Sequence, residues 1–250
     1  MSRGSLAGLR IMLTRPEGEG AEEWAAALVQ AGAVPIAYPT VAILPPKSWQ
    51  PVDEAAAKLD TYDWMVFTSQ TAVRFFASRL STGQFASDLR AKIAAVGKST
   101  AQSIERLGGR VTLVAADSRQ EGLVEELGLL AAGTHLLLPL AAGGRTLLAR
   151  SLRASGCTVD VVTVYRTEPK PDLATPPEFD VAVFASPSAL RAYVKSLGTS
   201  HLAGKTIAVI GPTTAKEAEI NGLCAVVADT PGVDALVLAI SRSRPNQGGT

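Results

Sequence analysis

The hydrophobic residues of the chain follow two patterns, short continuous runs and longer stretches with helical spacing. Trp64 to Phe67 is such a run, and after a polar turn apolar residues recur every three or four positions from Thr71 to Leu80. A short apolar run bounded by turns is typical of a buried strand, and the second spacing predicts an amphipathic helix. Because this order of strand, turn and helix recurs along the chain, we expect an α/β fold with parallel sheets flanked by helices.

Glycine and proline punctuate this pattern. A residue without Cβ adopts the left-handed conformation easily, so we expect the following glycines to end helices: Gly32, Gly108, Gly156 and Gly222. Proline-rich breaks cover residues 39–51 and 168–177, whereas no comparable linker lies near residue 125. The breaks therefore predict that the domain boundaries do not divide the chain at its midpoint.

Two stretches of the chain return later in the same order. Residues 62–74 resemble residues 179–191, and residues 93–101 resemble residues 207–215. The first pair shares residue types at equivalent positions: Asp63 and Asp180, Phe67 and Phe184, Ser69 and Ser186, and Arg74 and Arg191. A weaker third pair joins residues 9–43 with residues 134–167. Repetition in one order predicts an internal duplication.

The breaks and the repeat together predict two lobes joined by a two-stranded β connector. The expected parts are residues 1–38 with 168–241 as lobe 1, 42–164 as lobe 2, and 39–41 and 165–167 as connector strands. Segments 38–43 and 161–167 are both strand-like, and each lies next to a break. Residues 242–250 have no apolar periodicity, so we expect a disordered tail.

Composition and charge remove several classes of function. The net charge is +1 and the Lys and Arg residues are scattered, which predicts no nucleic-acid partner and no membrane surface. His135 and His201 are the only histidines and lack ligand-spaced neighbours, so neither a metal site nor a histidine triad is expected. Cys157 and Cys224 are interpreted as reduced core residues. Without a signal-like start or an apolar repeat, the sequence predicts a cytoplasmic monomer.

Two glycine patterns resemble nucleotide-binding loops but lack required residues. The Gly97-Lys98 pair would need a glycine five positions earlier to form a phosphate-binding loop, and Lys92 stands there. Gly18 and Gly20 lack the third glycine of a dinucleotide fingerprint, and the acidic residues that follow would repel a pyrophosphate. Neither pattern predicts a nucleotide, and no cofactor is expected.

Turns rich in Ser and Thr lie between predicted strands and helices, at residues 68–71, 97–100, 185–188 and 211–214. One alternative is that their hydroxyls serve only as helix caps. The same edge of a parallel sheet also binds ligands, and helix amino ends there offer N–H groups to carboxylates. The alternative is therefore a site for a ligand with many acidic groups. Its candidate binding residues are Ser69, Gln70, Gly97, Lys98, Ser99, Thr100, Ser186, Pro187, Ser188, Gly211, Pro212, Thr213 and Thr214.

Two further side chains are candidates for the same ligand. Arg15 follows the first predicted strand, and it either adds a fork of donors to the site or is a solvated surface charge. Tyr165 lies on the predicted connector, where it is either an ordinary packing residue of a strand or a hydroxyl donor to the ligand.

Several motifs, in this order and spacing, resemble the uroporphyrinogen-III synthase family along nearly the whole chain. They are Leu13-Thr-Arg-Pro16, Phe67-Thr-Ser69, Val164-Tyr-Arg-Thr167, Phe184-Ala-Ser-Pro-Ser188 and Ile210-Gly-Pro-Thr-Thr214. The resemblance implies two α/β lobes joined by a two-strand ladder. It also implies an enzyme of haem, sirohaem and cobalamin biosynthesis that binds hydroxymethylbilane in the cleft between the lobes. Loss of water and inversion of ring D would then give uroporphyrinogen III, without cofactor or metal.

The resemblance also implies roles for individual residues. Tyr165 matches the tyrosine that is thought to assist departure of the substrate hydroxyl, and Thr213 and Thr214 match the paired threonines of the family. Hydroxyls that line the cleft are matched by Ser69, Thr100 and Ser186. The chain departs from the family pattern at Ala185, where threonine is common, and at Leu140, where arginine is frequent.

Other functions are compatible with the same residues. One alternative is a non-catalytic two-lobed module that binds a tetrapyrrole or a small anion and regulates without chemistry. A second is a structural or regulatory protein that uses the cleft for a partner chain, but the hydroxyl-rich turns argue against the apolar cleft that this would need.

Overall fold

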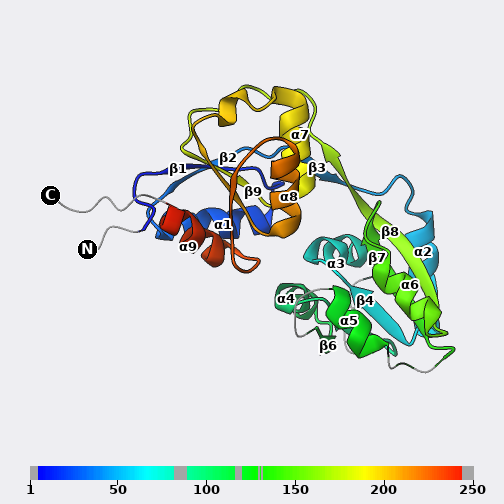
Figure 1. Cartoon of the computed structure of the whole chain (residues 1–250). Coiled ribbons are helices and arrows are strands. Elements are labelled where there is room, and N and C mark those ends of the chain that lie inside the picture. The colour runs from blue at the N-terminus through cyan, green and yellow to red at the C-terminus, as the bar shows by residue number, and fades with distance from the viewer. Residues whose placement is uncertain (1–4, 82–88, 116–119, 129, 131, 244–250) are drawn as a thin grey trace. The chain divides into compact units, whose positions relative to one another are not determined.

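The computed structural model describes residues 5–81, 89–115, 120–128, 130 and 132–243. The chain divides into two compact units: unit 1 consists of Met1–Ala42 and Glu168–Thr250, and unit 2 of Ile43–Thr167. Each unit contains one sheet with helices on both faces (Figure 1). The expected α/β fold with parallel sheets flanked by helices is therefore confirmed.

The sheet of unit 1 has five parallel strands in the order β11-β10-β9-β1-β2. Their bounds are Arg10–Leu13 for β1, Val34–Ala37 for β2, Val181–Phe184 for β9, Thr206–Val209 for β10 and Ala225–Val227 for β11. Helices α1 (Glu19–Gln30) and α9 (Val233–Ser243) pack on one face, and α7 (Pro187–Leu197) and α8 (Pro212–Ile220) on the other (Figure 1). The 3-10 turn η2 (Ser200–Leu202) precedes β10.

The sheet of unit 2 has the order β3-β8-β7-β4-β5-β6, and its strands from β8 to β6 are parallel. The bounds are Val41–Leu44 for β3, Trp64–Phe67 for β4, Lys92–Ala95 for β5, Val111–Val114 for β6, His135–Ala141 for β7 and Thr158–Pro169 for β8. One face is covered by α2 (Gln50–Ala57), the 3-10 turn η1 (Leu59–Thr61), α3 (Gln70–Ala77) and α4 (Lys98–Arg106). The other face is covered by α5 (Gln120–Leu127) and α6 (Leu147–Ala154).

Central strands are buried on both faces, which explains their continuous apolar sequences. Every residue of β4 and of β9 is buried, because helices cover the sheet above and below these strands. In β4, Met65 and Phe67 face α2 and α3, while Trp64 and Val66 face α5 and α6. Because successive side chains of a strand point to opposite faces, this one tetrapeptide contributes to two separate cores.

Each sheet contains a point where its connections reverse direction. In unit 1 the chain runs from β1 through α1 to β2 on one side, and from β9 through α7 to β10 on the other. In unit 2 the reversal lies between β4 and β7. Open parallel sheets bind ligands outside the carboxyl ends of the strands at such a point. The shared strand order suits an internal duplication, which stays a prediction.

The glycines expected to end helices each follow a helix in the structure. The helix-ending glycines all have positive φ: 88° at Gly32, 85° at Gly108, 86° at Gly156 and 70° at Gly222. The interpretation of both cysteines as core residues was wrong for Cys224, which is exposed, whereas Cys157 is buried. Cys224 lies between the end of α8 and the edge strand β11, where fewer elements cover the chain.

The strands expected to connect the lobes are longer than the sequence suggested. Strand β3 pairs with β8, and β8 continues for twelve residues to Pro169. The chain passes between units inside β3 and inside β8. At the end of the chain α9 continues to Ser243, past the start of the expected disordered tail, and residues 244–250 of that tail lie outside the described residues.

Within the described residues, no helix has the length and apolarity that a membrane span requires.

Candidate active site

Two serine turns follow equivalent central strands, β4 in unit 2 and β9 in unit 1. Ser69 is the N-cap of α3 and its Oγ accepts a hydrogen bond from the Ala72 amide at 3.1 Å. Ser186 is the N-cap of α7 and its Oγ accepts from the Ala189 amide at 3.2 Å. The backbone angles of the two serines differ by only a few degrees in ψ, 151° against 154°. The capping role is therefore real, and each serine side chain satisfies only one of the amides that a first helical turn leaves unpaired.

The turns after β5 and β10 are built differently, with glycine as the N-cap. Gly97 begins α4 and Gly211 begins α8, and neither helix has a side-chain cap. The hydroxyl-bearing Thr100 and Thr214 are each only 3% exposed, so both are packed under the first turn. The exposed groups of these turns are those of the preceding residues, Lys98, Ser99, Pro212 and Thr213.

The helix amino ends in the two units differ in their first residue. Pro187 and Pro212 occupy the first position of α7 and α8, whereas Gln70 and Lys98 occupy it in α3 and α4. Proline fixes the backbone in a helical conformation but offers no N–H. The first turns of unit 1 are therefore stiffer and carry one donor fewer than those of unit 2. In unit 1, Ser186 and Ser188 also hydrogen-bond through their hydroxyls at 3.0 Å.

Tyr165 owes its direction to an irregularity in β8. Leu140 of β7 pairs with Thr163, but the next residue, Ala141, pairs with Tyr165, so Val164 is an extra residue on β8. Such a bulge turns the following side chain to the face opposite to the one that simple alternation would give. Val164 and Tyr165 consequently both pack against the core under α2 and α3.

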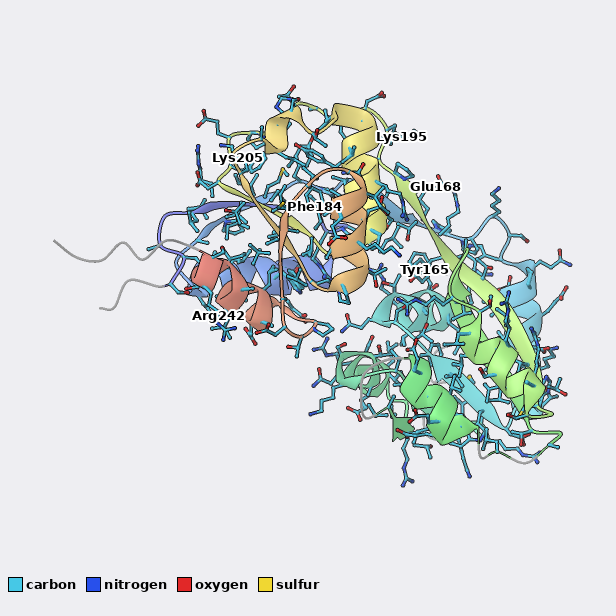
Figure 2. All side chains as sticks on the ribbon, viewed as in Figure 1. Tyr165, Glu168, Phe184, Lys195, Lys205 and Arg242 are labelled. Atoms are coloured by element: carbon cyan, nitrogen blue, oxygen red, sulfur yellow. The ribbon has the colours of Figure 1, made fainter. Side chains whose placement is uncertain are left out.

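The half-buried Tyr165 ring reaches the serine turn of the same unit. Its hydroxyl lies 3.4 Å from Ser69 Oγ, and its ring stacks on Phe75 of α3 with centroids 5.8 Å apart. Figure 2 labels Tyr165 on β8, where the strand passes α3. A phenol hydroxyl is thus placed beside the amino end of a helix, at the carboxyl edge of the unit 2 sheet.

The Arg15 side chain is partly buried, so it is not a solvated surface charge, and not all of its N–H donors are exposed. Its guanidinium lies 4.5 Å from the centroid of the Trp24 ring, and its Nε is buried without a partner among the described residues. Burial lowers the pKa of Arg15, and the nearby Glu23 carboxylate opposes that shift. An arginine stays protonated under these conditions, so the partly buried Arg15 retains its positive charge.

Gly20 explains how Arg15 fits against α1. A Cβ at Gly20 would lie 2.9 Å from an Arg15 guanidinium nitrogen, so any larger residue would displace the side chain. Just before Arg15, Thr14 donates its hydroxyl to the Val183 carbonyl at 2.8 Å, which ties β1 to β9 at the reversal point. Gly20, which resembles part of a nucleotide-binding loop in the sequence, therefore leaves space for the Arg15 side chain.

The structure groups the candidate residues by unit. In unit 1, Arg15 and the turns at 186–188 and 211–214 follow the adjacent strands β1, β9 and β10. In unit 2, Ser69 and Gln70 follow β4, the turn at 97–100 follows β5, and Tyr165 lies on β8. The hydroxyls of Ser69 and Tyr165 lie 3.4 Å apart.

The aromatic residues that support Tyr165 were not predicted from the sequence. Phe75 was one of several apolar positions on a predicted helix, and Trp49 lay in a proline-rich break. The available signal was the concentration of aromatic residues around α3, at positions 67, 75 and 76. Leu140, where the family often has arginine, is buried against α6 and acts as a core residue.

No group of three or more His, Cys, Asp or Glu residues suited to a metal ion occurs among the described residues.

Comparison with known proteins agrees with the motifs. The family model of uroporphyrinogen-III synthase HemD matches residues 22–238. The uroporphyrinogen-III synthase of Synechococcus elongatus is 33% identical over 259 residues, which cover 97% of this chain and 98% of that protein. A putative uroporphyrinogen-III synthase of Methanothermobacter thermautotrophicus is 29% identical, with 92% of this chain and 97% of that protein covered.

Solved structures show the same fold. Uroporphyrinogen-III synthetase of Helicobacter pylori matches with a TM-score of 0.66 at 17% identity, covering 94% of this chain and all of that chain (100%). A mutant uroporphyrinogen III synthase of Thermus thermophilus matches with a TM-score of 0.62 at 19% identity, covering 94% and 98% of the two chains. On the family model and the sequence relatives together, the chain belongs to the uroporphyrinogen-III synthase family.

Proposed function

We propose that this enzyme cyclises hydroxymethylbilane to uroporphyrinogen III, with loss of water and inversion of ring D. The observation that carries the proposal, beside family membership, is the position of the Tyr165 hydroxyl, 3.4 Å from Ser69 Oγ at the amino end of α3. The reaction needs no cofactor, because an electron-rich pyrrole expels water readily once the substrate is correctly folded.

Tyr165 would act as a neutral hydrogen-bond donor to the leaving hydroxyl. A phenol is a donor and an acceptor at once, so it can support departure of water without first losing its proton. Ser69 is the neighbouring group that can accept a hydrogen bond from the Tyr165 hydroxyl or donate one to it. Positioning contributes more than strong acid–base chemistry in such a step.

The carboxylates of the substrate would be bound by helix amino ends and by Arg15. The first turns of α3, α4, α7 and α8 present amides and the positive end of the helix dipole at the carboxyl edges of the two sheets. Lys98, Ser99, Ser188 and Thr213 supply side-chain donors there, whereas the buried Thr100 and Thr214 would act by shaping their turns. The proposed binding set is Arg15, Ser69, Gln70, Gly97, Lys98, Ser99, Thr100, Ser186, Pro187, Ser188, Gly211, Pro212, Thr213 and Thr214.

Control of substrate geometry is the main task of this enzyme. Hydroxymethylbilane closes spontaneously without inversion to the symmetric type I isomer, so only an enforced conformation gives type III. We also propose that the protein acts as a cytoplasmic monomer in tetrapyrrole biosynthesis. Sedimentation at micromolar protein concentration tests the oligomeric state, and a dimer mass would contradict it.

Isomer analysis tests the function directly. Freshly generated hydroxymethylbilane is mixed with purified protein, and the product is oxidised and separated into type I and type III uroporphyrins. Type III product well above the protein-free control supports the synthase. If only type I forms, titration with uroporphyrinogen decides whether the chain is a binding module, and binding without turnover would favour that alternative.

A further inference from the structure

Tyr165 is the last ring of a continuous aromatic stack in unit 2. Its ring stacks on Phe75 with an interplanar angle of 25° and centroids 5.8 Å apart. Phe75 in turn stacks on Trp49, with an angle of 23° and centroids 6.3 Å apart. The three rings come from β8, from α3 and from the N-cap of α2, so the stack joins elements that are distant in sequence.

The outer end of the stack is closed by a charged pair. The Arg79 guanidinium lies 5.1 Å from the Trp49 ring centroid. Two hydrogen bonds, at 2.7 and 2.8 Å, join Arg79 to both carboxylate oxygens of Asp53 on α2. Two hydrogen bonds restrict the rotation of this guanidinium, so Trp49 contacts a cation of restricted orientation as well as Phe75.

Packing, rather than hydrogen bonding, determines where the Tyr165 hydroxyl lies. Its contact with Ser69 is 3.4 Å long, beyond the 2.5–3.0 Å that is typical of hydroxyl hydrogen bonds, and such a contact constrains the ring weakly. The bulge at Val164 directs the side chain to the face of α3, and the offset-stacked Phe75 then limits the rotation of the ring.

We propose that Phe75, supported by Trp49, is the positioning residue of the reaction and acts by holding the Tyr165 hydroxyl at the substrate's leaving group. This inference rests on the proposed function, because it assigns no chemistry of its own. Phe75 touches Tyr165 and not the reacting atoms. Its loss should lower kcat and the fraction of type III isomer, since a misplaced donor slows closure with inversion while spontaneous closure continues.

Phe75→Leu and Phe75→Tyr form the decisive pair. Leucine keeps an apolar side chain but removes the stack, so we expect kcat to fall roughly 10- to 100-fold with KM changed less than about 3-fold. Tyrosine keeps the ring and should restore kcat to within about 3-fold of the wild type. Equal losses in both variants would overturn the proposal.

A double-variant cycle separates positioning from general packing. In the Tyr165→Phe background no hydroxyl remains to be placed, so Phe75→Leu should cause little further loss of kcat. A loss as large as in the wild-type background would show that Phe75 acts independently of Tyr165, which contradicts the inference. Trp49→Leu should show the same dependence on Tyr165 with a smaller effect, and Trp49→Phe should be close to the wild type.

A matched packing variant controls for stability. Leu59→Ala removes a buried side chain from the same core on η1, so its melting temperature should fall at least as far as that of Phe75→Leu. Its kcat and isomer ratio should stay at wild-type values below that temperature. If kcat falls as far in Leu59→Ala as in Phe75→Leu, the loss of activity comes from weaker packing of the unit 2 core and the proposal is wrong. If the wild type itself yields only type I product, the proposed function fails before this inference is reached.

Discussion

The two units use one scaffold but equip it differently. Both have a buried tetrapeptide strand, a serine N-cap with the same backbone conformation, and a glycine-initiated helix after the next strand. Unit 1 adds proline at the start of both helices and a partly buried arginine, whereas unit 2 adds the Tyr165 hydroxyl and its aromatic stack. The difference teaches that both scaffolds offer helix amino ends suited to carboxylates, while the proposed catalytic hydroxyl belongs to unit 2 alone.

The arginines at matching positions of the two units, Arg191 and Arg74, have different partners. Arg191 donates to Glu217 at 2.6 Å, and Asn221 also donates to that carboxylate, which is only 11% exposed. In unit 2 the position equivalent to Glu217 is Ser103, and no carboxylate pairs with Arg74 in the described part of the chain. Arg74 instead lies 5.3 Å from the Phe75 ring centroid.

The strongest test of scaffold equivalence lies in the central strands. Phe67 and Phe184 are both fully buried at the end of their strands. Replacing either with alanine should cost about 3 to 5 kcal/mol, because both leave a cavity in a close-packed core. Hydrogen exchange should show each loss confined to its own unit. Loss of protection in both units from one variant would mean that they do not behave as separate compact units.

Replacing the arginines at matching positions of the two units should change stability by different amounts. Arg191→Met leaves the Glu217 carboxylate without its cation, and we expect a loss of about 1 to 2 kcal/mol, reduced because the arginine is itself 60% exposed. Arg74→Met should change stability by less than about 0.5 kcal/mol. Urea denaturation of both variants measures the difference, and equal losses would contradict the assigned asymmetry.

Removing either serine cap should lower stability by a similar amount, but the two losses of kcat should differ. Ser69→Ala and Ser186→Ala each remove one capping acceptor, which typically costs about 1 kcal/mol. Only Ser69 lies next to the Tyr165 hydroxyl, so Ser69→Ala should lower kcat further than Ser186→Ala. Thermal melts and single-turnover kinetics separate the two effects, and a larger kcat loss in Ser186→Ala would reverse the assignment.

The smallest expected effect is on the pH dependence of folding stability, to which Asp160 of unit 2 contributes. Its carboxylate accepts hydrogen bonds from Tyr62 at 2.8 Å and Lys58 at 3.0 Å, and His135 Nε2 lies 3.3 Å away. Desolvation alone would raise the pKa of Asp160, but these contacts outweigh it and hold the pKa below the ordinary 3.8. A lowered pKa stabilises the fold above the ordinary value, and the stabilisation disappears as the pH falls through the lowered pKa.

Asp160→Asn should therefore melt about 2 °C below the wild type at pH 7. The gap should narrow as the pH falls below about 3.8, since the wild-type carboxylate then becomes protonated as well. Calorimetry at several pH values measures this gap. A gap that stays constant down to the acid transition would show that the charge of Asp160 does not contribute.

The sequence predicted the scaffold well because the scaffold depends on local signals. The apolar run at Trp64 to Phe67 located β4 to the residue, and glycines located helix ends, since both follow from backbone sterics and burial. The orientation of Tyr165 was beyond prediction, because a bulge depends on the register of β8 with β7 and leaves no compositional trace. The burial of Thr100 and Thr214 was likewise hidden, as it follows from packing of the first helical turn.

The Tyr165 hydroxyl is the proposed catalytic group in unit 2, and Tyr193 of unit 1 provides its matched control. Tyr193 is fully buried, its hydroxyl has no partner among the described residues, and burial raises its pKa to about 12. Tyr165→Phe should lower the rate of type III formation about 100-fold or more, while Tyr193→Phe should leave that rate unchanged. Equal type III rates in Tyr165→Phe and the wild type would contradict the account.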